Sequence, residues 1–134
     1  MGGSSDLDIN TRIIVNELQA LIAQAKGQTD QAITLLKEAT RLEESMRPPN
    51  GAAEPIKPSH ELLGEVLLQA GKAKEAAEAF ETSLLRMPNR ARSLMGAIKA
   101  HSAAGDKARA AERLATLNSF WKGKPFTGTT TELR

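Results

Sequence analysis

The chain contains no cysteine and no tyrosine, and only one tryptophan and three phenylalanines among its 134 residues. The absence of cysteine excludes disulfide bonds, thiolate nucleophiles and cysteine-based zinc or iron–sulfur sites. Two histidines offer little for a metal site either. An aromatic content of 3% is poor for a β-sandwich or barrel and for stacking on nucleic-acid bases. The composition therefore favours an all-α fold, and we expect no metal and no cofactor.

Long hydrophobic runs are also missing. No apolar stretch approaches the roughly 20 residues needed to span a bilayer, so we expect no membrane segment. A hydrophobic share of 40% and a charged share of 25% are typical of a soluble globular protein, and the length suits one domain. Residues 1–5 lack the basic and apolar regions of a secretory signal, and nothing in the sequence assigns a cell compartment.

Charge is distributed unevenly along the chain. Residues 1–66 carry ten acidic and six basic side chains, although the whole chain has a net charge of +2. Between residues 86 and 124, nine basic side chains meet two acidic ones. This asymmetry can steer an anionic partner toward the second half, or it can be an ordinary solvated coat of charge.

A repeat is the strongest pattern in the sequence. Gly71 and Gly105 lie 34 residues apart, and aligning the chain on them pairs Ser59 with Ser93. An earlier copy joins this alignment at Gly27 once an insertion of ten residues is allowed. The three copies span residues 13–46, 57–90 and 91–124.

Each copy has the apolar spacing of two helices joined by a turn. Apolar residues recur every three or four positions, the period breaks at the glycine, and it then resumes. Glycine tolerates the positive φ that a helix needs where the chain turns back. Pro88 ends the second helix of the middle copy. The pattern predicts six helices in three antiparallel hairpins.

Domain boundaries follow from the same pattern. Four of the six prolines fall within residues 47–58, which predicts a loop inserted between the first two copies. Residues 1–8 are predicted to be a flexible start, residues 9–121 a single domain, and residues 122–134 an irregular tail.

Residues 57–90 resemble the tetratricopeptide repeat (TPR) family. The motif positions of the family are occupied by His60-x2-Leu63-Gly64-x2-Leu67, Ala76-x3-Phe80 and Pro88, and five of these seven residues match. Histidine and leucine replace the family's large aromatics at the first and fourth of these positions, and the other two copies match more loosely. The short Ala-rich repeats are similar to those of bacterial members and suggest a segment of a larger protein. The resemblance implies a short right-handed superhelix, and a generic antiparallel helical bundle is the alternative.

The resemblance also implies a function. TPR proteins are non-catalytic scaffolds that hold a peptide or a partner helix in a concave groove lined by the first helix of each repeat. The groove-facing positions implied for this chain are Glu17, Leu21, Gln24, Glu61, Glu65, Gln69, Arg92, Met95 and Lys99. Acidic residues stand at 61 and 65, where chaperone-binding members carry cations or amides, which argues against a clamp for a C-terminal carboxylate.

Other functions compete with this one. The basic second half could bind nucleic acid or another polyanion, which would require steep salt dependence, although no nucleic-acid motif is present. Glu61 and Glu65 lie four residues apart and could act as paired acid and base, but no second catalytic partner is visible, so we expect no enzyme. His60 and His101 are interpreted as packing substitutes for aromatics rather than metal ligands.

The end of the third hairpin is apolar. Its apolar side chains are Leu114, Leu117, Phe120 and Trp121. The last two of these are interpreted as a cap on the core or as an interface anchor. We expect this end to be covered by the tail around Pro125 and Phe126, by a second copy through self-association, or by another part of a longer protein.

Overall fold

The computed structural model describes residues 2–46 and 57–128, with side chains from residue 8 onward. These residues form six α-helices and no strand, which confirms the predicted all-α class. The helices are α1 (Gly2–Ala25), α2 (Thr29–Glu44), α3 (Ser59–Gln69), α4 (Ala73–Arg86), α5 (Ala91–Ala103) and α6 (Lys107–Phe120). The predicted loop falls mostly on residues 47–56, and residues 129–134 end the predicted tail; both segments lie outside the described residues.

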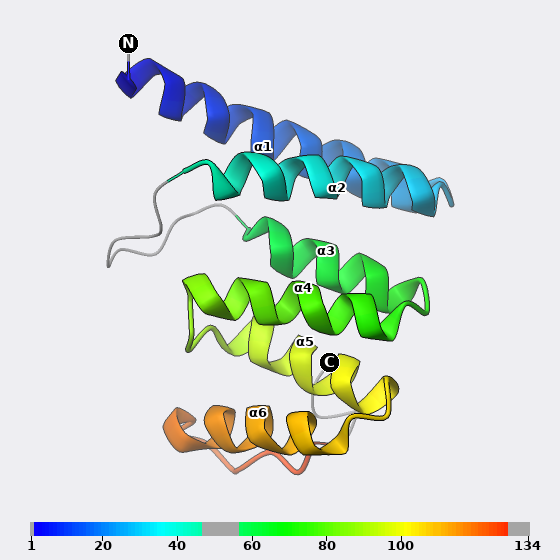
Figure 1. The fold of residues 1–134 in the computed structure, drawn as a ribbon, viewed down its shortest axis with the longest axis vertical. Helices are drawn as coiled ribbons and strands as arrows, with labels where there is room; N and C mark the ends of the chain where they lie inside the picture. The colour runs from blue at the N-terminus through cyan, green and yellow to red at the C-terminus, as the bar shows by residue number, and fades with distance from the viewer. Residues whose placement is uncertain (1, 47–56, 129–134) are drawn as a thin grey trace.

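The helices pair into three hairpins that lie one above another (Figure 1). Each hairpin packs on the next: α3 contacts α1 and α2, and α5 contacts α3 and α4. The odd-numbered helices also contact one another in space: α1 contacts α3, and α3 contacts α5. Within the described residues, the backbones of α2 and α4, and those of α4 and α6, do not approach each other in this way, and these helices meet only through long side chains. The odd-numbered helices therefore form a continuous face of the stack.

The three hairpin turns have the same geometry. Gly27, Gly71 and Gly105 have φ values of 78°, 80° and 84°, as the repeat pattern predicted. In the middle turn, the backbone N–H of Lys72 donates to the carbonyl of Leu67 at 2.9 Å, and the other two turns repeat this bond. Such a bond closes a helix whose next residue is left-handed, and glycine adopts that conformation without a steric penalty.

Helix α1 begins earlier than the sequence suggested. The flexible start was predicted to cover residues 1–8, whereas the helix already begins at Gly2. Ile9 packs against the buried Ile13 in a small apolar cluster with residues of α2. Once this packed turn exists, each preceding residue extends the helix without a new nucleation cost, so small residues can join it.

Phe80 of α4 is the central side chain of the core. It is 1% exposed and lies against Gly64 of α3 and Gly96 of α5. A Cβ atom added at Gly64 would be 2.9 Å from the ring, and one added at Gly96 would be 2.2 Å away. The ring therefore fills space that only glycine leaves open, and it joins the second hairpin to the third.

The tail folds back over the third hairpin. The Asn118 side chain accepts a hydrogen bond from the Phe126 N–H at 2.8 Å and donates one to the Phe126 carbonyl at 3.0 Å. The Phe126 ring packs on the main core and lies 4.9 Å from the Trp121 ring. This is one of the three coverings expected from the sequence. Across the described residues, no helix combines the length and the apolar character needed to cross a membrane.

The contact of Phe80 with Gly96 generates a stability prediction. Gly96→Ala lowers the free energy of unfolding by about 1–3 kcal/mol, because the new methyl group overlaps the ring. In an open helical position the same change would stabilise by about 1 kcal/mol. Urea denaturation measures the difference, with the exposed Ser102→Ala on the same helix as the control. In a Phe80→Leu background, Gly96→Ala lowers the free energy of unfolding by less, because the ring that the methyl group overlaps is gone. An equal loss in that background would show that overlap with the Phe80 ring is not the cause.

Candidate functional site

A hollow between α3 and α5 brings together five of the nine residues predicted to line a groove. Its lining residues are Glu65, Leu68, Gln69, Phe80, Arg92, Met95, Gly96 and Lys99. Glu65 and Gln69 lie four residues apart, and so do Met95 and Lys99, which places each pair on one side of its helix. The two helices are adjacent on the odd-numbered face. Residues that the helical periodicity placed on one side of α3 and on one side of α5 therefore line the same hollow.

The hollow is small and has mixed chemistry. Its volume of about 150 Å³ is the size of a side chain, well below the roughly 300–1,000 Å³ of small-molecule pockets. Leu68, Met95 and the Phe80 ring supply apolar surface, and Phe80 reaches the hollow beside Gly96. On the rim, Arg92 lies 3.6 Å from Glu65. The site can accept an apolar side chain beside a polar or charged group.

The first copy extends this face. The amide of Gln24 on α1 donates a hydrogen bond to the side-chain oxygen of Gln69 on α3. Leu21, one turn before Gln24, is 43% exposed. Gln24 therefore contacts a residue that lines the hollow, and neither of these two predicted residues is among the lining residues.

Glu61 is not available to a partner, which corrects its predicted place in the groove. Its side chain is completely buried. Arg90 donates to its two carboxylate oxygens at 2.7 and 2.9 Å, Ser93 donates at 2.7 Å, and Lys57 lies 2.7 Å away. Burial alone would raise the pKa of Glu61, but the hydrogen bonds from Arg90, Lys57 and Ser93 hold it below the ordinary value. The ionised carboxylate joins α3 to the start of α5.

Glu17 holds the equivalent position in the first copy and is also corrected to a buried residue. It is 6% exposed, and the Ser59 hydroxyl donates to it at 3.3 Å. The counterpart of Arg90 in the repeat alignment is Ile56, so the sequence supplies no matching cation. Burial, reinforced by the nearby Glu43 carboxylate, raises the pKa of Glu17 to about 7. Equivalent carboxylates thus have opposite electrostatic environments.

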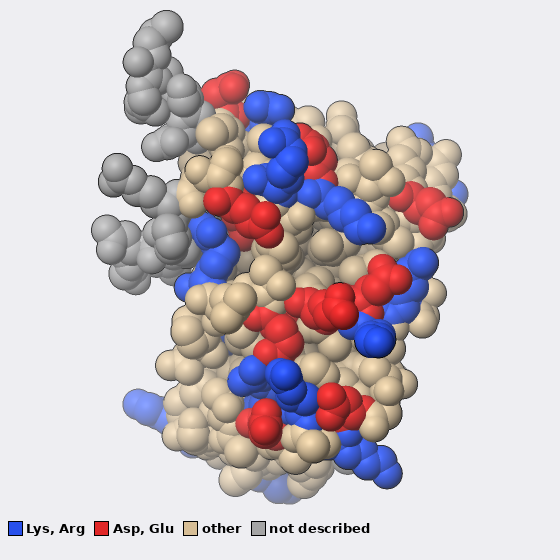
Figure 2. All heavy atoms as spheres, viewed as in Figure 1, with Lys and Arg blue, Asp and Glu red and all other residues tan. Residues whose placement is uncertain are grey.

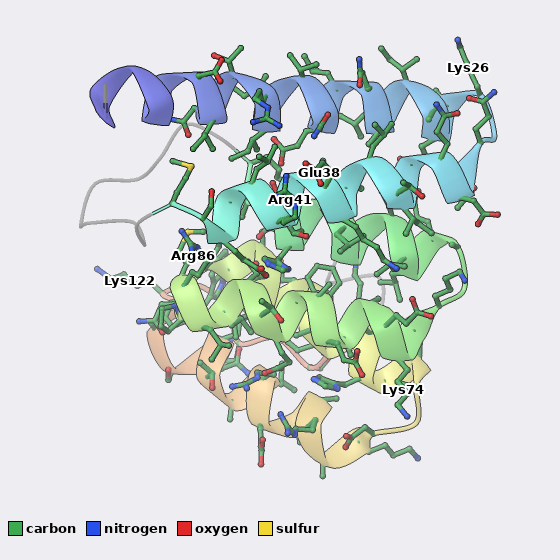
Figure 3. All side chains as sticks on the ribbon, turned by 45° about the horizontal axis from the view of Figure 1, so that its top comes forward. Lys26, Glu38, Arg41, Lys74, Arg86 and Lys122 are labelled. Atoms are coloured by element: carbon green, nitrogen blue, oxygen red, sulfur yellow. The ribbon has the colours of Figure 1, made fainter. Side chains whose placement is uncertain are left out.

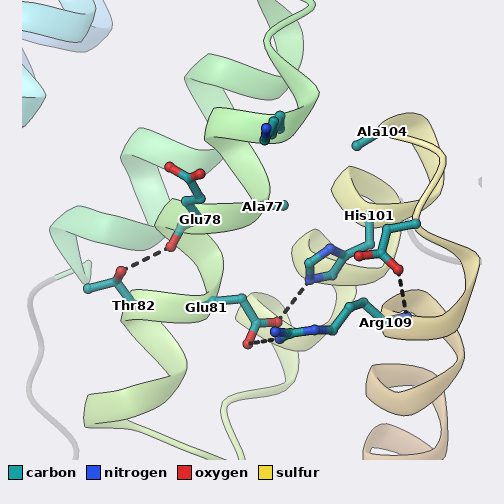
Figure 4. A pocket seen from close by; sticks show the side chains of 9 residues that line it. Ala77, Glu78, Glu81, Thr82, His101, Ala104 and Arg109 are labelled. Atoms are coloured by element: carbon teal, nitrogen blue, oxygen red, sulfur yellow. Dashed lines mark hydrogen bonds and ion pairs between the residues drawn. The ribbon is translucent and has the colours of Figure 1, made fainter.

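A second cluster lies around Glu81 on α4, in a depression between α4 and the α5–α6 turn (Figure 4). His101 Nε2 is 3.0 Å from one carboxylate oxygen, Arg113 Nε donates to it at 2.7 Å, and Arg109 lies 3.8 Å from the other oxygen. Burial opposes ionisation, but the hydrogen bonds from Arg113 and His101 lower the pKa of Glu81. Sequence reasoning missed this residue because its partners lie 20 and 32 positions away.

Both histidines make the same kind of contact. His60 Nε2 lies 2.8 Å from Glu44, across the junction of the first and second hairpins, as His101 does from Glu81 across the next junction. Among residues 8–46 and 57–128, no cluster of three or more metal-ligating side chains is found. The two histidines join hairpins.

Basic residues of the second half lie on different faces. Arg92 and Lys99 line the hollow on the odd-numbered face, whereas Arg109 lines the depression beside Glu81. Figure 2, which views α2, α4 and α6, shows acidic and basic side chains interleaved. Arg86 lies near the C-terminal end of α2 (Figure 3), 3.8 Å from Glu43. Acidic side chains of α2, α3 and α4 therefore offset much of the basic excess.

Comparison with known proteins adds no relative. Neither a scan against protein-family models nor a search of curated protein sequences finds a match to this chain.

The raised pKa of Glu17 predicts a pH dependence of stability. Because the folded value of about 7 exceeds the ordinary 4.5, the folded chain keeps a proton that the unfolded chain releases in that window. The free energy of unfolding therefore falls between pH 4.5 and 7, by at most about 3 kcal/mol. Glu17→Gln removes this fall and exceeds the wild type in stability at pH 8.

Urea denaturation at several pH values measures this difference. The exposed Glu78→Gln on α4 has the same loss of charge and should keep the wild-type pH profile. A Glu17→Gln profile parallel to that of the wild type contradicts the assignment of the pH dependence to this carboxylate.

For Glu61, whose pKa is lowered rather than raised, we expect that loss of the charge destabilises the protein at neutral pH. Glu61→Gln lowers the free energy of unfolding at pH 7 by about 3 kcal/mol, because Arg90 and Lys57 lose their ionised partner. In a double-mutant cycle, Arg90→Gln and Glu61→Gln together cost less than the sum of their separate losses. Additive losses, measured by urea denaturation, would show that the pair is not coupled.

Proposed function

We propose that this chain is a non-catalytic protein-interaction scaffold of the TPR type, whose three stacked hairpins form a short right-handed superhelix. The observation that carries the proposal is the convergence of Glu65, Gln69, Arg92, Met95 and Lys99 on one hollow. Three left-handed glycine turns of matching geometry and hairpins stacked in chain order support the repeat assignment.

The size and the lining residues of the hollow indicate which kind of ligand it can bind. A volume of one side chain suits an apolar anchor residue of a peptide or of a partner helix, packed on Leu68 and Met95. Arg92 and Lys99 stand seven residues apart on α5, so they flank the anchor along the helix. We therefore expect a segment with an apolar residue and a neighbouring acidic one.

Polyanion binding is the weaker alternative. It would need basic side chains gathered on one surface, whereas Arg92 and Lys99 lie apart from Arg109. Arg113 and Arg90 are also engaged by the carboxylates of Glu81 and Glu61. Pairing within the molecule leaves less positive charge for phosphate groups.

Peptide selection tests the scaffold function. Linear peptides are selected from a random display library on the wild-type chain, and their dissociation constants are measured by fluorescence anisotropy. Met95→Ala and Arg92→Glu each weaken binding at least tenfold, because they remove the apolar contact and the rim charge.

The matched controls lie outside the hollow. Leu85→Ala removes a side chain that is 83% exposed, and Arg109→Glu reverses a half-exposed arginine paired with Glu81. Both should leave the dissociation constant unchanged, with thermal melting as a check on folding. Selection of no peptide, together with salt-dependent retention on heparin, would favour the polyanion alternative.

A further inference from the structure

Helix α1 carries an apolar stripe that nothing in the described structure covers. Its members are Ile14, Val15, Leu18, Leu21 and Ile22, which are 41%, 43%, 55%, 43% and 55% exposed. Between Arg12 and Lys26 the sequence has one charged residue, Glu17, and that side chain is buried. A surface of this kind on a helix at one end of the stack (Figure 1) indicates a contact with another molecule.

The repeat alignment identifies which face this is. Leu18 and Ile22 correspond to Leu62 and Val66 of α3, which are 7% and 2% exposed. These residues of α3 are buried because the first hairpin packs on one side of the second and the third hairpin on the other. Helix α1 has a neighbouring hairpin on one side only. Around Leu18 and Ile22 the stripe is thus the uncovered counterpart of a surface that is core in the next hairpin.

A preceding hairpin joined as the others are does not fit here. Helix α5 begins at Ala91, after a short turn that follows the end of α4 at Arg86, and α3 begins near the equivalent position, at Ser59. Ser59 corresponds to Val15, yet α1 is helical from Gly2 and has no turn at that point. The covering surface therefore comes from a chain segment that is not connected in this way.

The spacing of the stripe points to the occupant. Ile14 and Ile22 each lie four residues from Leu18, and Val15 and Leu21 each lie three residues from it. The stripe therefore reads the same in both directions along the helix. We propose that α1 of a second copy of this chain covers it, antiparallel, with a two-fold axis at Leu18. Ile14 then meets Ile22, Val15 meets Leu21, and Leu18 meets itself, as a two-fold interface requires.

Charge supports the antiparallel direction. In this register Arg12 lies opposite Gln24, and Lys26 lies opposite Asn10, so no like charges meet. A parallel pair in register would place Arg12 against Arg12 and Lys26 against Lys26. Like charges across an interface are unfavourable, so the antiparallel pair is preferred.

The area that two α1 helices can bury against each other limits the stability of the dimer. One pair of helices buries less than the roughly 1,600 Å² of a standard stable interface. We therefore expect a dimer that dissociates on dilution. The hollow between α3 and α5 is lined by the second and third hairpins and by none of the residues of the stripe.

Cysteine cross-linking tests the arrangement, since the chain has no cysteine of its own. Under mild oxidation Leu18→Cys forms a disulfide-linked dimer, because the two-fold axis brings this position against itself. Ile14→Cys alone does not, but a mixture of Ile14→Cys and Ile22→Cys does. Cross-linking of Ile14→Cys to itself, with none at Leu18→Cys, overturns the antiparallel arrangement.

Sedimentation equilibrium tests the dimer without cross-linking. The wild type shows a concentration-dependent monomer–dimer equilibrium, and Leu18→Glu is monomeric at every concentration. Leu85→Glu, at a more exposed leucine on α4, keeps the wild-type equilibrium, and circular dichroism verifies that both variants are folded. A wild type that remains monomeric up to millimolar concentration, or a Leu18→Glu variant that still dimerises, overturns the proposal. Loss of the dimer in Leu85→Glu instead would equally place the contact elsewhere.

Discussion

The packing of Phe80 against two glycines is the constraint on which the second and third hairpins depend. The ring is buried where a Cβ at Gly64 or Gly96 would overlap it, so α3 and α5 both approach α4 closely. That approach also creates the hollow between α3 and α5, which Phe80 and Gly96 both line. The contact that closes the core therefore also shapes the surface that we propose as a binding site.

Buried carboxylates at the junctions add specificity to this apolar packing. Glu61 is ionised among Arg90, Lys57 and Ser93, and its hydrogen bonds require one register between α3 and α5. Glu17 occupies the same position of the repeat and has a serine partner but no arginine, so burial dominates its pKa. The repeated backbone therefore does not repeat the electrostatics, because the charged groups that surround each carboxylate decide its protonation.

Local features of the sequence were the most predictable ones. The three glycine turns and the end of α4 before Pro88 follow from backbone sterics that act within a few residues. Five groove positions were also found together, since residues on one helical face stay on one face wherever the helix packs. Helix α1 begins before residue 9, because the preceding residues join a helix that the packing of Ile9 and Ile13 stabilises.

The sequence by itself determined the number of helices, their pairing into hairpins and the residues that share a helical face. The tertiary structure alone decided which of those faces are covered. Glu61 and Glu65 lie four residues apart on α3, yet the first is buried under Arg90 of the next hairpin and the second lines the hollow. Leu18 and Leu62 are equivalent in sequence, yet only the second is core. The physical reason is that periodicity reports the direction of a side chain, whereas burial depends on what the rest of the chain places opposite it.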